Sequence, residues 1–142
     1  MLNSFLKMIS GGTKSDRDIK AIMPLVDKAG AEFQKLRSIS NDELREMTVS
    51  FKQRIADAVS IEREEIASIK EKIETNFDME IEEKEDFFKR IDELEKDEYK
   101  KTQDVLLEIL PLAFAVVRET GRRFKENEVL EVTAQQFDRD IA

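Results

Sequence analysis

Carboxylates and basic groups are the most abundant side chains here that could do chemistry, and the chain contains neither histidine nor cysteine. This composition excludes Ser-His-Asp and Cys-His nucleophiles, thiolate zinc sites and the Glu-x-x-His ligands of di-iron bundles. The many glutamate pairs between residues 62 and 104 could in principle bind metal or act as acid and base. Exposed carboxylates generally keep ordinary pKa values, however, and nothing nearby supplies a pocket. We therefore expect no catalytic residue and no metal ligand.

The sequence Gly-Gly-Thr-Lys-Ser at residues 11–15 shares residue types with a phosphate-binding loop. A Walker A loop requires Gly-x-x-x-x-Gly-Lys-Ser/Thr between a strand and a helix. Here Thr13 separates glycine from lysine, and no strand is expected before it. We expect no cofactor-binding residue in this chain.

The first nine residues form a short amphipathic segment, with Leu2, Phe5, Leu6 and Ile9 on one helical stripe and Lys7 elsewhere on the wheel. The segment lacks the basic region and cleavage site of a signal peptide. Two interpretations remain open. The segment either lies on a membrane surface or a partner, or it is a frayed terminus or simply packs within the protein.

The elements that must position all these groups are predicted to be helices. Two prolines and four glycines against 39% charged residues are few turn formers, which favours an all-α fold. Apolar spacings of three and four predict a first helix capped by Ser15, with a break at 37–39. Ser40 and Glu43 form a capping box for a second helix, which is expected to continue unbroken to about Thr75.

A long helical hairpin is predicted next. The turn-forming sequence Asn-Phe-Asp at 76–78 separates helix 55–75 from helix 81–104, and the two are expected to pair antiparallel. Residues 62–104 hold 17 acidic and 9 basic residues, so this stretch accounts for the whole net charge of −8. The charge indicates either a solvated surface or a basic partner, and it disfavours nucleic acid.

The stretch after the hairpin is apolar around most of its circumference, and Pro111 is expected in the first turn of a new helix there. Such a helix should be buried on several sides, and we expect this chain to self-associate if the face is uncovered. The residues predicted to pack against a larger body are Leu112, Phe114, Ala115, Val116, Val117 and Phe124.

Basic residues gather at the end of this helix, at Arg118, Arg122, Arg123 and Lys125, where cations offset the helix dipole. Beyond them, residues 129–132 could form a strand, and Thr133 is expected to cap a last helical turn.

Two stretches resemble the start of the SecA family, the motor ATPases of bacterial protein export. One is Ser-Ile-Ser-Asn-Asp-Glu-Leu-Arg-Glu-Met-Thr at 38–48 with Phe-Lys-Gln-Arg at 51–54. The other is Ile-Leu-Pro-Leu-Ala-Phe-Ala-Val-Val-Arg-Glu-Thr-Gly-Arg-Arg at 109–123. The sequence departs from the family pattern at Leu112, where glutamate is usual, and at 57–104, which fill an ordinarily short connection.

The resemblance implies ATP-driven movement of preproteins through the SecYEG channel, in the cytoplasm at the inner face of the cell membrane. It implies contact of Leu2, Phe5, Leu6, Lys7 and Ile9 with the channel or with acidic phospholipid. ATP and Mg would belong to the full-length protein, whose Walker motifs are expected beyond residue 142, so we do not expect this chain to hydrolyse ATP.

The resemblance also suggests a division of the chain. Residues 1–12 are the amphipathic segment, and 13–56 are N-terminal helices of an α/β motor domain. Residues 57–104 are an inserted hairpin whose role the family does not indicate. Residues 105–142 are a helix and connector leading into a nucleotide-binding domain, because no terminating signal follows. The alternatives are a stand-alone coiled-coil adaptor and a peripheral membrane module acting through residues 1–9.

Overall fold

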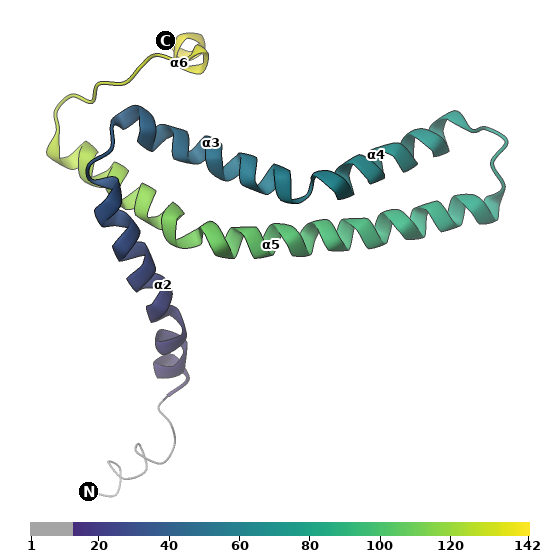
Figure 1. Ribbon diagram of the computed structural model, residues 1–142, viewed down its shortest axis with the longest axis horizontal. Helices are drawn as coiled ribbons and strands as arrows, with labels where there is room; N and C mark the ends of the chain where they lie inside the picture. The colour runs from purple at the N-terminus through teal and green to yellow at the C-terminus, as the bar shows by residue number, and fades with distance from the viewer. Residues whose placement is uncertain (1–12) are drawn as a thin grey trace, which may run out of the picture. The chain divides into compact units, whose positions relative to one another are not determined.

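The computed structural model describes residues 13–142, which form five helices and contain no strand (Figure 1). The helices are α2 (Lys14–Leu36), α3 (Asn41–Ala58), α4 (Ser60–Thr75), α5 (Ile81–Glu126) and α6 (Gln136–Ile141). The all-α prediction is confirmed. Internal packing divides the chain into two units: a hairpin unit, Arg45–Ile109, and a terminal unit, which contains the residues up to Leu44 and from Leu110 onward.

Helix α2 is capped by Thr13 and not by the predicted Ser15. The Asp16 backbone N–H donates to the Thr13 hydroxyl at 3.2 Å, and the Thr13 N–H donates to the Asp16 carboxylate at 2.8 Å. This reciprocal capping box satisfies two donors, which Ser15 inside the first turn could not do. Pro24 and Gly30 both lie within the helix, so neither ends it.

The predicted capping box at Ser40 and Glu43 is confirmed, with bonds of 2.7 and 3.1 Å between the two residues. The predicted unbroken helix to Thr75 is wrong, because the helix is interrupted at Val59. Val59 is fully buried, and the Ser60 hydroxyl donates to the Asp57 carbonyl at 3.1 Å. The break is accommodated in two ways. The β-branched side chain of Val59 is buried, and the Ser60 hydroxyl satisfies the carbonyl of Asp57 that the break leaves free.

Helix α5 contains Pro111 in its interior, so the prediction that Pro111 starts a new helix is wrong. An interior proline costs an isolated helix about 3 kcal/mol. Buried residues occur on both sides of the proline, at Ile109 and at Ala115 and Val116. Burial of this apolar stretch offsets the lost hydrogen bond, and periodicity alone does not reveal that compensation.

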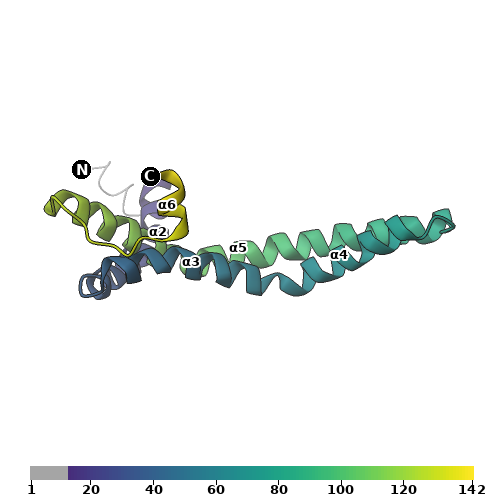
Figure 2. The same cartoon turned by 90° about the horizontal axis from the view of Figure 1, so that it is seen from above.

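The predicted antiparallel hairpin is confirmed in the hairpin unit, where α4 lies alongside the first part of α5 (Figures 1 and 2). Its core consists of Ile66 and Ile69 from α4 and Ile91 and Leu94 from α5, with Ile73 and Phe87 packed against it. At this turn of α5, Phe87 packs against the core and the neighbouring Phe88 is exposed.

Ion pairs flank this core. Arg63 contacts Glu98 at 2.7 Å, and Lys101 contacts Glu62 at 2.6 Å. The bond from Lys101 lowers the pKa of Glu62. Each pair joins a residue of α4 to a residue of α5. The pairs therefore fix the register of the hairpin.

No helix within residues 13–142 combines the length and apolarity required to cross a bilayer.

Candidate functional site

The terminal unit is organised around Arg123 of α5, which is buried. Its Nη2 donates to the backbone carbonyls of Leu36 at 3.0 Å and Ile39 at 2.8 Å. Its Nη1 donates to Asn41 Oδ1 at 2.7 Å, and its Nε donates to Glu119 at 2.8 Å. The last carbonyls of a helix lack intrahelical partners. Arg123 therefore caps the end of α2 and joins it to the start of α3.

Glu119, beside this arginine, is 0% exposed and completely enclosed. Its two carboxylate oxygens accept from Arg122 Nε at 2.9 Å and Arg122 Nη2 at 2.7 Å. The bonds from Arg122, opposed by burial and reinforced by Arg123, lower the pKa of Glu119 to about 2. Glu119 in turn raises the pKa of Arg122, which also contacts Glu126. The carboxylate is thus held ionised as a buried anchor for two arginines, which is a structural role.

The segment that follows α5 is tied to the start of α3. Asn41 Nδ2 donates to the Glu131 carbonyl at 2.8 Å. Asp42 accepts from the Thr133 backbone N–H at 2.8 Å and from the Thr133 hydroxyl at 2.5 Å. Residues 129–132 form no strand, and Gln135, not Thr133, precedes α6 as its N-cap. Both predictions for this segment are wrong. Asp42 takes the Thr133 side chain, so Thr133 does not cap the last helix.

An open apolar groove lies between α2 and α5 of the terminal unit. Its volume is about 520 Å³. The residues that line it are Ile22, Leu25, Val26, Ala29, Gly30, Leu110, Pro111, Phe114, Ala115 and Arg118. Gly30 has no heavy atom within 4 Å of an added Cβ, so the groove is open above it. Exposed apolar surface of this kind marks a site for a partner surface.

One cation belongs to this groove. The Arg118 guanidinium carbon lies 4.1 Å from the centroid of the Phe33 ring, and Phe33 is buried. This stacking holds the arginine along the groove wall by a cation–π interaction. The groove therefore offers an apolar surface with one positive charge.

The residues predicted to pack against a larger body fall into two sets. Ala115 and Val116 are buried within this chain, and Leu112 is half-buried. Phe114 is 62% exposed, and Val117 and Phe124 are exposed to a similar degree. The sequence did not distinguish these two sets, because an apolar stretch on all sides has no periodicity that marks the inner face.

The other predicted contact residues, Leu2, Phe5, Leu6, Lys7 and Ile9, lie outside the described residues. The roles of Arg123 and Glu119 were missed. Their only signal was a glutamate four residues before an arginine in an apolar helix, a pattern that is also common on exposed helices.

The chain is similar to translocase subunits of several bacteria. It is 45% identical over 131 residues, or 92% of its length, to the protein translocase subunit SecA of Phocaeicola vulgatus. It is 46% identical over 132 residues to SecA of Cytophaga hutchinsonii. It is 43% identical over all of its 142 residues to SecA of Amoebophilus asiaticus. The alignment with this last relative therefore includes the residues of the hairpin unit.

The chain spans about 12% of the length of each of these relatives. No protein-family model matches the chain, and no solved structure matches it significantly.

Proposed function

We propose that this chain, which belongs with the SecA proteins, is a structural part of a preprotein translocase motor. Nearly its whole length is homologous to one segment of those proteins. The complete motor would use ATP and Mg to move preproteins through the SecYEG channel. This segment would supply helical packing and would not carry out catalysis.

The observation that carries the proposal is the uncovered apolar surface of the terminal unit. Phe114, Val117 and Phe124 are exposed along α5, and Phe114 also borders the groove against α2. Burying a large apolar side chain stabilises a protein by about 1.5–3 kcal/mol, so such exposure is expected where another surface normally covers it. The relatives are many times longer than this chain, and the rest of the motor is the surface that we propose.

The proposal is tested by recombining the two parts. SecA of Cytophaga hutchinsonii lacking its matched segment should capture this chain when both are co-expressed. Phe114→Ser combined with Val117→Ser should weaken capture roughly tenfold, because both side chains lose an apolar partner surface. Phe88→Ser is the matched control, since Phe88 is 51% exposed on the same helix but belongs to the hairpin unit. Equal loss in both variants, or no capture at all, would contradict the proposal.

The same exposed face should make the isolated chain self-associate. Light scattering should show a mass that rises with concentration, and the Phe114→Ser, Val117→Ser variant should remain closer to the monomer mass. A strict monomer at high concentration would show that the face needs no cover.

We further propose that Leu2, Phe5, Leu6, Lys7 and Ile9 contact acidic phospholipid or the SecYEG channel from the cytoplasmic side of the membrane. An apolar stripe with a nearby lysine suits an anionic surface. Co-sedimentation with acidic liposomes should decrease on Lys7→Glu and on Phe5→Ala. Unchanged co-sedimentation in both variants would refute membrane contact by this segment.

A further inference from the structure

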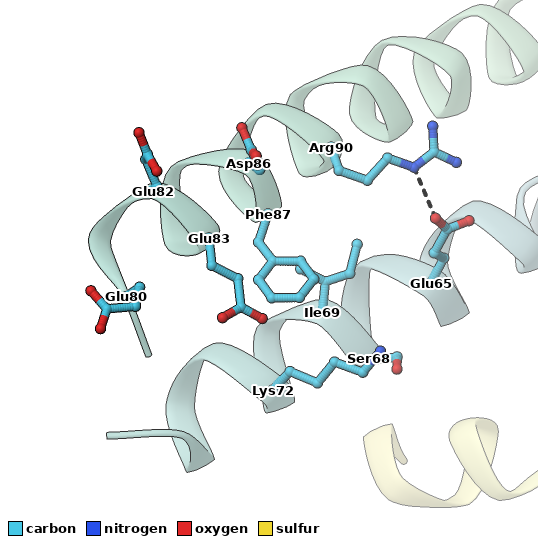
Figure 3. A pocket seen from close by; sticks show the side chains of 10 residues that line it. All are labelled: Glu65, Ser68, Ile69, Lys72, Glu80, Glu82, Glu83, Asp86, Phe87 and Arg90. Carbon is cyan, nitrogen blue, oxygen red and sulfur yellow. Dashed lines mark hydrogen bonds and ion pairs between the residues drawn. The ribbon is translucent and has the colours of Figure 1, made fainter. Parts of the chain in front are cut away.

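The hairpin unit has a groove of its own near the connection between α4 and α5. Its volume is about 680 Å³. Figure 3 shows Ile69 of α4 and Phe87 of α5 facing each other between the two helices, with Glu83 extending from α5 toward α4. Phe87 is half-buried and packs against the buried Ile69, so Phe87 supplies the accessible apolar floor of the groove.

The connection next to this groove exposes further apolar side chains. Phe77 is 94% exposed and Ile81 is 77% exposed. A helical hairpin that only has to be solvated needs no phenylalanine in its turn, because Asn, Asp and Gly suffice there. The solvated-surface interpretation explains the charges of the hairpin but leaves these two residues without a role. Exposed apolar residues beside a groove are typical of a contact site.

The charged residues at the rim of the groove indicate which kind of partner it binds. The rim contains Glu80, Glu82 and Glu83, which make no ion pair within the described part of the chain, and a single unpaired cation, Lys72. The other basic residue, Arg90, already contacts Glu65 at 2.9 Å. The groove therefore presents an apolar floor within a net negative rim, inside a stretch that accounts for the net charge of −8. Phosphate backbones and anionic lipid surfaces are repelled by such a rim.

We propose that this groove and the exposed Phe77 dock a basic amphipathic polypeptide segment. Its apolar side chains cover Phe87 and Phe77, and its lysine or arginine side chains reach the carboxylates of Glu80, Glu82 and Glu83. Such a segment complements both the apolar floor and the negative rim, whereas a free cation would leave the apolar floor uncovered. The inference concerns the hairpin unit alone and does not depend on the proposed motor function.

A synthetic helical peptide with leucines on one face and lysines on the other is the probe, and fluorescence anisotropy with the 142-residue chain is the readout. The triple variant Glu80→Gln, Glu82→Gln, Glu83→Gln should bind about tenfold more weakly, because three exposed ion pairs are lost. Phe77→Ser should weaken binding about fivefold through lost apolar contact. Rising salt should weaken binding to the original chain, because the pairs are exposed.

The matched control is the triple variant Glu85→Gln, Asp92→Asn, Asp97→Asn. It removes the same charge from α5 at exposed positions that do not line the groove. It should change the affinity less than about twofold, as screened charges away from the contact do. Circular dichroism should show that every variant keeps its helices.

Three results would overturn the proposal. Equal weakening in both triple variants would mean that the peptide responds to the overall field of the hairpin and not to the groove. Undiminished binding of a peptide with glutamate in place of lysine would remove the charge argument. Absence of binding by the lysine peptide, or groove-dependent binding of RNA or anionic vesicles instead, would reject the occupant.

Discussion

Replacing Arg123 with methionine tests whether one side chain of α5 holds the end of α2 and the start of α3. Methionine fills a similar volume but donates no hydrogen bond. The change would leave the carbonyls of Leu36 and Ile39 and the side-chain oxygen of Asn41 without the donor that they have now. Loss of one member of a buried charged pair costs about 3–5 kcal/mol, and Glu119 retains Arg122. We therefore expect a loss near the lower limit, about 3 kcal/mol.

Arg122→Met is the control, because it removes the same side chain from the neighbouring position. The ion-pair partners of Arg122, Glu119 and Glu126, are both on its own helix, and its side chain is partly exposed. Exposed local pairs contribute roughly 0.3–1 kcal/mol, but Glu119 is buried and keeps Arg123, so we expect a cost of about 1–3 kcal/mol that is confined to α5. The two variants differ in whether the lost bonds join separate segments.

Hydrogen exchange resolved along the chain measures this difference, since it reports the opening free energy of each segment separately. In Arg123→Met, amides of residues 33–44 should exchange about 100-fold faster, which corresponds to about 3 kcal/mol. Amides around Leu94 in the hairpin unit should be unaffected. Equal acceleration in the two variants, or none in Arg123→Met, would refute the assignment of Arg123 as the link between these segments.

Three further outcomes are expected. Leu94→Ala should cost the hairpin unit about 3 kcal/mol in urea unfolding, because Leu94 is buried in its core, whereas Phe88→Ala should cost under about 1 kcal/mol. The pKa of Glu119 is lowered to about 2, so its ionised carboxylate contributes to the free energy of unfolding above the ordinary value of 4.5, and this contribution is lost as pH falls toward 2. Unfolding curves recorded between those pH values should show the loss of stability. The Glu119→Gln variant should not show this pH dependence. Ser40→Ala should lower stability by about 1 kcal/mol through loss of the helix cap, as measured by thermal unfolding.

Local patterns in the sequence determined much of the hairpin unit. The sequence Asn-Phe-Asp identified the turn and the two antiparallel helices beside it, whose core contains Ile69 and Leu94. The Ser40 capping box was also read correctly. These features depend on residues three or four positions apart, and their physical causes are contained in the sequence window itself.

The tertiary structure decided the places where distant segments meet. Val59 breaks a helix that periodicity continues, and Pro111 remains inside one that its residue type would end. Thr133 bonds to Asp42 and not to its own neighbours. In each case burial or a long-range hydrogen bond outweighs a local preference of a few kcal/mol or less.

The same division applies to the candidate site. The sequence alone showed that the stretch around Phe114 is too apolar to be fully solvated, and that residues 62–104 are acidic. Only the structure separated buried Ala115 from exposed Phe114, and joined Arg123 to a carbonyl 87 positions earlier in the chain. Composition determines how much apolar and charged surface a chain possesses. Which part of that surface remains open is decided by packing between segments that are remote in sequence.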